Sequence, residues 1–257
     1  MRFVMENPFL GAMKARPYMA EMNRFMTKVD YCQYHVVDAE GARTPYPYQK
    51  PTCIWTNLEG WDARRCRCEG RRHASSLVGD RARGRRLDFR QGRTPSRTFK
   101  HAVPDTLHET LLEAVLRAAP HATWVLDLFS GSQSLRGSCA RLGLGYVSCD
   151  IASSVKMLRA GAYRTVHTDI VGDLSGVDLQ RLIRRAAEHV GEQPRDLLLV
   201  WASPPCDTFS CANSLRRPSL RPRDFSDPAR PPLTDAARRD DALVEGLVAQ
   251  LLRCDVA

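Results

Sequence analysis

The chain has 257 residues, of which 43% are hydrophobic and 26% are charged. This length and composition favour a single globular domain, with an insert at most, and argue against a chain that is disordered throughout. No apolar run approaches the roughly 20 residues of a membrane-spanning helix, and the first residues lack a secretory pattern, so we expect an intracellular protein.

Positive charge is concentrated in one segment. Residues 64–97 contain twelve arginines, no lysine and three acids, which account for the whole net charge of +9. Such a patch suits a polyanion, because each arginine that neutralises a phosphate releases condensed counterions. The alternative is a solvated arginine-rich loop, and charge alone does not decide between the two.

Nine cysteines are scattered along the chain, unlike the compact disulfide framework of a small secreted domain, so we expect thiols. Cys66 and Cys68 with His73 form a weak zinc candidate, with Cys32 or Cys53 as further candidates. The spacing lacks the usual C-x-x-C, and the alternative is a set of ordinary thiols.

The first predicted element is an apolar strand over residues 2–5, which leads directly into Glu6, Asn7 and Pro8. Regular alternation of helices and strands begins at residue 105. Thr106 and Glu109 have the spacing of a capping box, and apolar residues at helical spacing predict a helix that extends to about residue 119.

The alternation continues to the end of the chain. Apolar runs predict strands, and longer stretches with an apolar face predict helices. In order, the pattern predicts a strand at 123–129, a helix around 135–142, strands at 146–150 and 165–169, a helix over 179–190, a strand at 197–201, a loop over 202–233 and a helix over 244–252.

This alternation predicts an α/β fold with a doubly wound, mostly parallel sheet of Rossmann-like type. Any ligand is then expected at the carboxyl ends of the strands, where Asp127, Asp150 and Asp169 fall beside the turn 129–131. Three such acids indicate a nucleoside-like ligand. The turn lacks G-x-G-x-x-G and a following P-loop lysine, which favours S-adenosylmethionine over dinucleotides and nucleoside triphosphates. Each aspartate taken singly also fits a helix cap or a turn.

The final predicted helix has no strand after it, although an alternating fold calls for one. Residues 2–5 supply that strand, so we expect a circular permutation of an ordinary doubly wound domain, whose ends often lie close together. This order places Glu6 at the end of the strand beside the one that leads to Cys206.

Three motifs resemble those of cytosine-5 DNA methyltransferases. Residues 127–131 (Asp-Leu-Phe-Ser-Gly) look like the cofactor turn, 203–206 (Ser-Pro-Pro-Cys) with Phe209 and Ser210 like the nucleophile loop, and 6–8 (Glu-Asn-Pro) like the Glu-Asn-Pro/Val motif. The glutamate comes first, as in the permuted members of the family, including the plant domains-rearranged type. Residues 31–34 and 50–57 also resemble phage-like and animal de novo type enzymes.

The resemblance implies an enzyme that transfers a methyl group from S-adenosylmethionine to carbon 5 of cytosine in double-stranded DNA. Cys206 would add to carbon 6 of a flipped-out base, Glu6 would bind ring nitrogen 3 and the exocyclic amine, and Lys50 would replace the arginines that position the carbonyl. The expected cofactor-binding residues are Asp127, Phe129, Ser130, Gly131, Asp150, Asp169, Ile170 and Pro204.

One methyltransferase domain over 1–257 is therefore expected. Residues 1–60 would form the permuted part of the sheet, 61–100 an arginine-rich DNA-recognition insert, and 101–257 the cofactor and nucleophile half. The loop 212–234 would cover the flipped base. The protein would act in the nucleus of a eukaryote, or in the cytoplasm of a bacterium or of a phage host.

Two other functions fit the same residues. One is the same chemistry on structured RNA. The other is an inactive homologue that binds nucleic acid, since Lys50 and Thr52 occupy the positions of the usual arginines. As structural alternatives, Cys206 would be a cysteine after a rigid turn and Glu6 a helix N-cap.

Overall fold

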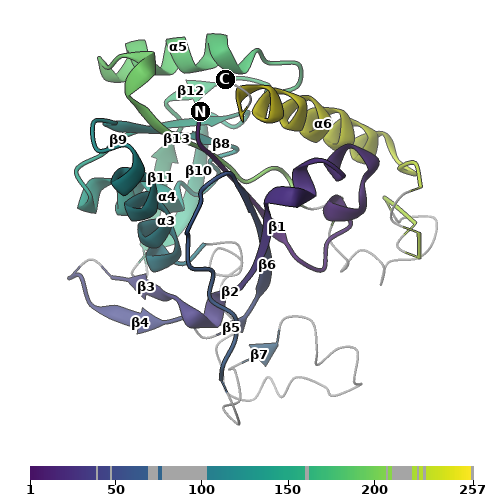
Figure 1. Cartoon of the computed structure of the whole chain (residues 1–257), viewed down its shortest axis with the longest axis horizontal. Helices are drawn as coiled ribbons and strands as arrows, with labels where there is room; N and C mark the ends of the chain where they lie inside the picture. Colours follow the sequence, from purple (N-terminus) through teal and green to yellow (C-terminus); the bar gives the residue numbers. More distant parts are fainter. Residues whose placement is uncertain are drawn as a thin grey trace.

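A seven-stranded sheet forms the centre of the molecule (Figure 1). The computed structural model describes residues 1–38, 40–46, 48–68, 75–76, 103–159, 162–206, 208–209, 222–224, 226–227 and 230–255. From edge to edge the strands are β12 (Ile170–Val171), β9 (Gly145–Asp150), β8 (Trp124–Leu128), β13 (Leu197–Ala202), β1 (Phe3–Pro8), β6 (Pro51–Thr56) and β2 (Met26–Asp30).

The strands from β12 to β1 run parallel to one another, whereas β6 is antiparallel to both β1 and β2. The central strand β13 reads Leu-Leu-Leu-Val-Trp-Ala, a continuous apolar run, because a parallel strand in the middle of such a sheet is buried on both faces. The predicted mixed α/β architecture with a mostly parallel sheet is confirmed, and it is compatible with a Rossmann-like fold.

Helices cover both faces of the sheet (Figure 1). Among the described residues, the α-helices are α3 (Asp105–Ala118), α4 (Ser134–Arg141), α5 (Leu179–Val190) and α6 (Asp235–Asp255). One core cluster joins α5 and α6 to Phe3 and Met5 of β1, and a second joins α3 and α4 to Val4 of the same strand, because successive side chains of a strand point to opposite faces.

Helix α5 shows how local sequence fixes an element. The Asp178 carboxylate accepts hydrogen bonds from the backbone N–H groups of Gln180 and Arg181, and Gly191 ends the helix with a φ of 72°. None of the helices in the described ranges is both long enough and apolar enough to cross a bilayer.

Shorter elements lie around the main sheet. Two of the three additional two-stranded sheets are antiparallel, and the third is parallel. The remaining elements are β3 (His35–Val37) with β4 (Arg43–Pro45), β5 (Tyr48–Gln49) with β7 (Ser75–Ser76), β10 (Ser154–Arg159) with β11 (Ala162–His167), and the 3-10 helices η1 (Met13–Ala15), η2 (Pro17–Met19), η3 (Met22–Phe25), η4 (Tyr31–Gln33) and η6 (Pro194–Asp196).

The order of the strands reverses between β8 and β13. From β8 the chain proceeds outward to β9 and β12, and it then returns to place β13 on the other side of β8. In open α/β sheets, ligands bind in the crevice outside the carboxyl ends of the strands at such a reversal. The segments that follow β8, β13 and β1 therefore form the part of the molecule where a site is expected.

The predicted capping box at the start of α3 is wrong. Pro104 is the N-cap and no side chain caps the helix. The Thr106 hydroxyl instead accepts a hydrogen bond of 2.7 Å from the backbone N–H of His35, and the Glu109 carboxylate accepts one of 2.6 Å from Arg141. Tertiary contacts to β3 and α4 thus use the two side chains that the local pattern assigned to capping.

Asp169 does not end a strand of the main sheet, contrary to the sequence prediction for 165–169. Residues 162–167 form β11, which pairs antiparallel with β10 in a separate sheet. Asp169 lies before β12, the strand that pairs with β9. An antiparallel partner nearby in the sequence therefore replaces the expected parallel pairing of this segment.

A buried histidine makes the stability of the fold depend on pH in the acidic range. His108 of α3 is fully buried against the Trp201 ring, with 4.8 Å between the ring centroids, and burial lowers its pKa from 6.5 to about 4. Protonation therefore favours the unfolded chain. We predict that the free energy of unfolding falls as the pH decreases from about 6.5 to about 4, by about 3 kcal/mol from this group.

Urea titrations across this pH range measure the effect. His108→Phe should flatten the acid slope, whereas the same change at the exposed His121 should leave it intact. An unchanged slope in His108→Phe would contradict the assignment.

Candidate active site at the carboxyl edge of the sheet

The pairing of β1 with β13 places the glutamate motif beside the Pro-Pro-Cys motif. Val4 pairs with Trp201 and Met5 with Ala202 in parallel register. Glu6 and Ser203 are the next residues along these two segments. The end of β1, residues 6–8, therefore lies beside the segment 203–206 that follows β13, although the two are about 200 residues apart in the sequence.

Glu6 is buried and its carboxylate is held by two side chains. The Tyr31 hydroxyl donates a hydrogen bond of 2.8 Å to Oε1, and the Lys50 ammonium lies 3.9 Å from the same oxygen. Lys50 also lies over the Tyr31 ring, 4.7 Å from its centroid. Burial and the neighbouring Glu6 charge raise the pKa of Tyr31 well above 10, which keeps its hydroxyl a donor. Among the described residues, both contacts of Glu6 fall on Oε1.

Tyr31 was not assigned a role from the sequence. Its only sequence signal was membership of the 31–34 stretch that resembles phage-like enzymes. The structure brings together the predicted pair, Glu6 and Lys50, and adds this third residue.

The loop that carries Cys206 is fastened to both neighbouring strand ends. The Ser203 N–H donates to the Leu128 carbonyl at 3.2 Å, and the Asn7 side chain donates to the Pro204 carbonyl at 3.5 Å. Pro204 is buried, whereas Cys206 is only partly buried. The thiol therefore sits at the margin of the sheet and not within the core. Reactive cysteines are typically found in such partly exposed positions.

A second attachment follows Cys206. The Phe209 N–H donates to the Cys206 carbonyl at 3.1 Å, and the Phe209 carbonyl accepts from Ala12 N–H at 2.8 Å. Gly11 is needed at this crossing, because a Cβ there would lie 3.0 Å from the Pro8 carbonyl oxygen and 3.2 Å from that of Phe209. The Cys206 loop and the chain after Glu6 thus support each other.

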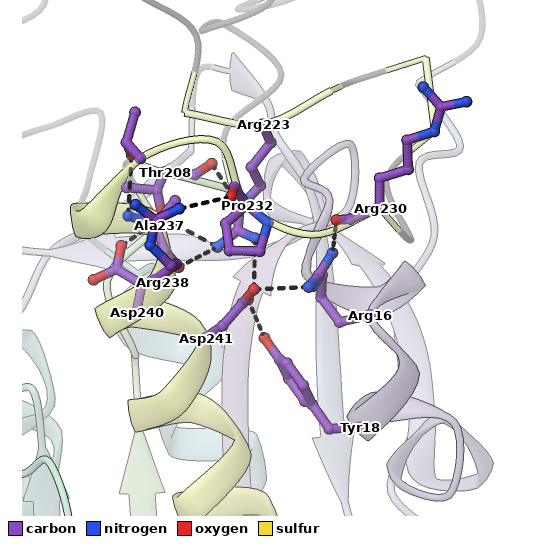
Figure 2. Close-up of polar contacts among 11 residues, drawn as sticks. Arg16, Tyr18, Thr208, Arg223, Arg230, Pro232, Ala237, Arg238, Asp240 and Asp241 are labelled. Atoms are coloured by element: carbon purple, nitrogen blue, oxygen red, sulfur yellow. Dashed lines mark hydrogen bonds and ion pairs between the residues drawn. The ribbon is translucent and has the colours of Figure 1, made fainter.

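A buried cluster of charges fixes the far end of the same loop. Asp241 of α6 accepts hydrogen bonds from Arg16 at 2.7 Å, from Arg223 at 2.9 Å and from the Tyr18 hydroxyl at 2.8 Å (Figure 2). The Arg223 guanidinium is 1% exposed and lies 4.0 Å from the centroid of the Phe209 ring. This contact links α6 to the residue that anchors the Cys206 loop.

The turn after β8 has the backbone geometry of a binding loop. Phe129 has a φ of 58° and Gly131 a φ of 42°, both in the left-handed region. The Gly131 N–H donates to Asp150 Oδ2 at 2.9 Å, and Ala152 N–H donates to Oδ1 at 3.0 Å. Asp150 at the end of β9 therefore shapes this turn.

Two features of this part of the molecule bear on ligand binding. The Ser130 hydroxyl is buried and makes no hydrogen bond to any described residue. Beside Phe129 lies a small, partly open hollow with a mostly apolar lining, formed by Leu128, Phe129, Leu174, Gly176, Val177, Leu179, Leu243, Gly246, Leu247 and Gln250.

Asp127 and Asp169 are engaged within the protein. Burial raises the pKa of Asp127 to about 7, and its carboxylate accepts a hydrogen bond of 2.6 Å from Tyr146 of β9. Asp169 Oδ2 accepts from both the N–H and the hydroxyl of Ser148 and from Arg136, and these bonds keep its pKa below the usual value. Ile170 is buried in β12 beside Cys149.

The structure gathers part of the predicted metal set. The sulfur atoms of Cys32, Cys66 and Cys68 lie within 4.8 Å of one another, whereas Cys53 is buried in β6. His73 lies outside the described residues. So do most of the arginine-rich segment and the greater part of the proposed lid at 212–234.

Comparison with known proteins gives no assignment. No protein-family model matches the chain, and no curated protein sequence matches it.

The Asp241 cluster should be essential for stability. Asp241→Ala removes the buried carboxylate that the Arg16 and Arg223 guanidinium groups both contact. We predict that Asp241→Ala lowers the free energy of unfolding by about 3–5 kcal/mol. Chemical denaturation measures this difference.

The matched control is Asp235→Ala in the same helix, whose carboxylate pairs with Arg238 at the surface. Exposed pairs contribute about 0–1 kcal/mol, so this variant should unfold nearly as the parent does. Equal losses in the two variants would show that the buried cluster has no special role.

Proposed function

We propose that this protein is a DNA cytosine-5 methyltransferase that uses S-adenosylmethionine. The observation that carries the proposal is the parallel pairing of β1 with β13, which brings the Glu6 motif next to the Cys206 loop. Two motifs from opposite ends of the chain that converge at the carboxyl edge of a sheet are better explained by a shared substrate than by two independent structural roles.

Cys206 would act as the nucleophile. Carbon 5 of cytosine reacts poorly with a methyl donor until a thiolate adds to carbon 6 and gives the ring enamine character. After the methyl group has been added, carbon 5 loses its proton and the Cys206–carbon 6 bond breaks, which restores the thiolate and the aromatic ring. The partial exposure of Cys206 and the fastening of its loop suit this step.

Glu6 would hold the base during addition. Its Oε1 is occupied by Tyr31 and Lys50, so Oε2 remains to contact ring nitrogen 3 or the exocyclic amine. Lys50 brings positive charge close to Glu6, where it can stabilise the charge that develops on the cytosine carbonyl. A lysine supplies this charge as a single point and lacks the donor fork of an arginine.

The residues after β8 and β9 fit S-adenosylmethionine. Ser130 offers an unsatisfied hydroxyl, Phe129 borders the apolar hollow, and Asp150 holds the turn open through Gly131. When bound, the cofactor supplies an electrophilic methyl group. Pro204, whose carbonyl accepts a hydrogen bond from the Asn7 side chain, would border the neighbouring side of the site. Asp127, Asp169 and Ile170 would support the pocket walls from within the sheet.

Double-stranded DNA is the proposed substrate. Arg64, Arg65 and Arg67 begin the arginine-rich segment close to η4, and 64–97 carries the net positive charge of the chain. Phosphate contacts from such a segment would position the duplex, while the cytosine is flipped into the pocket because carbon 5 and carbon 6 are inaccessible in stacked DNA.

The same proposal includes a circular permutation and a methyltransferase version of the fold. It is supported by the position of β1, which precedes every other strand in the sequence but lies inside the sheet between β13 and β6. In an unpermuted order, α6 would lead into the Glu6 strand, and the order of motifs would be cofactor turn, nucleophile, glutamate.

Covalent trapping tests the function. A duplex oligonucleotide that contains 5-fluorocytosine should form a stable adduct with the protein when S-adenosylmethionine is present, because the fluorine at carbon 5 cannot leave as a proton does. Denaturing electrophoresis and mass spectrometry of the tryptic peptide around Cys206 measure the adduct. Cys206→Ala should give none.

Cys139→Ala is the control, since Cys139 is a fully buried thiol of α4 in the core cluster that α3 and α4 form with the sheet. It should form the adduct as the parent does. An adduct with 5-fluorocytosine RNA alone would replace DNA by RNA as the substrate. No adduct with either nucleic acid would favour an inactive, nucleic-acid-binding protein.

Tyr31 should act as a positioning residue. Tyr31→Phe removes the hydrogen bond to Glu6, and the loss of a bond to a charged group, at about 1.5–3 kcal/mol, predicts an adduct formed about ten- to hundredfold more slowly. Tyr34→Phe is the matched control. Tyr34 is also buried, but its hydroxyl accepts a hydrogen bond from the Arg64 N–H and does not contact Glu6. If the tyrosine hydroxyls had only a structural role, both variants would form the adduct equally slowly, and the pH profile of trapping would not change. The proposed role alters that profile in Tyr31→Phe alone.

A further inference from the structure

Three cysteines from two distant stretches of the chain converge near the candidate site. Cys32 belongs to η4, whereas Cys66 and Cys68 lie in the segment after β6. Their three sulfur atoms all lie within 4.8 Å of one another, and all three side chains are partly buried. This is a separate cluster from Cys206, and the proposed methyl transfer does not use it.

The backbone around this thiol cluster (Cys32, Cys66 and Cys68) is fixed by several bonds. The Asp30 N–H donates to the Arg64 carbonyl at 3.0 Å, and the Asp30 carboxylate accepts from the Cys66 N–H at 3.0 Å. The Arg64 N–H donates to the Tyr34 hydroxyl at 3.0 Å. The convergence of the sulfur atoms is thus built into the fold on both sides of the cluster.

The spacing of the sulfur atoms suits a tetrahedral ion. Zinc–thiolate bonds of about 2.3 Å put two ligand sulfur atoms roughly 3.8 Å apart in a tetrahedral site, which is compatible with three sulfur atoms that all lie within 4.8 Å of one another. A disulfide would join only two of the three sulfur atoms. A divalent ion accommodates all three at once.

We propose that Cys32, Cys66 and Cys68 bind a structural zinc ion. The fourth position is left to water or to another side chain. His73, named with Cys66 and Cys68 in the sequence analysis, lies outside the described residues and is not needed for the proposal. Cys32, one of the two further candidates predicted from the sequence, brings a sulfur atom from η4 to the two from the segment after β6.

The surroundings of the thiol cluster include a side chain that contacts two of its sulfur atoms. The Gln33 side chain donates to Cys68 Sγ at 3.3 Å and to Cys32 Sγ at 3.7 Å, as outer-shell donors do around metal ligands.

The position of the site gives it a structural purpose. Cys32 directly follows Tyr31, which holds Glu6, and Cys66 lies two residues after Arg64, near the start of the arginine-rich segment. One ion would therefore tie the glutamate side of the site to the base of the positively charged segment.

Metal analysis of the full-length, reduced protein tests the proposal. We expect about one zinc ion per chain by mass spectrometry of the metal, and X-ray absorption should show sulfur ligands at about 2.3 Å. Cobalt substitution should give thiolate-to-cobalt charge-transfer absorption with tetrahedral visible bands. These readouts on the parent protein need no catalytic activity and do not depend on the proposed function.

Variants locate the ion. Cys32→Ser, Cys66→Ser and Cys68→Ser should each lose most of the zinc, whereas Cys139→Ser should retain it. Gln33→Leu should bind zinc about ten- to hundredfold more weakly while keeping the sulfur signature. Reduced protein without stoichiometric metal, a disulfide between two of the three cysteines, or full zinc content in Cys32→Ser would each overturn the proposal.

Discussion

The register between β1 and β13 is the constraint on which the candidate site depends. Because strand side chains alternate with a period of two, a shift by one residue would turn Glu6 to the opposite face and bury Met5 on the wrong side of the sheet. Phe3 and Met5 pack with α5 and α6, whereas Val4 packs with α3 and α4. The hydrophobic core on both faces therefore sets the position of Glu6, the polar residue that follows this apolar part of the strand.

Core packing alone does not hold the loop that follows β13. This loop depends on polar anchors: Ser203 on the end of β8, Phe209 on the chain after Gly11, and Arg223 on Asp241 of α6. Buried ion pairs add little net stability, but they permit few alternative arrangements, because each unpaired charge is costly. At Asp241 the pairs restrict where α6 and the loop end can lie, and thereby restrict Cys206.

Local patterns predicted the strands β8, β9 and β13 and the helices α3 and α5, because their apolar residues recur with a clear period and are bounded by turn residues. The same approach failed where tertiary contacts compete with local ones, as at Thr106, Glu109 and Asp169. It gave Tyr31 no role, since a buried tyrosine whose partner is 25 positions away leaves no periodic signal.

The two halves of the site are held in different ways. The turn at Gly131 is shaped by backbone N–H groups that donate to the Asp150 carboxylate. On the other side of the site, the Glu6 carboxylate is held by the charge of Lys50 and by the hydroxyl of Tyr31, which burial keeps neutral. These two side chains therefore set the electrostatic environment of Glu6. Tyr31 is covalently next to Cys32, whose sulfur lies in the thiol cluster. A shift in the position of Cys32 would therefore affect the position of Glu6, through Tyr31, more directly than it would affect the turn at Gly131.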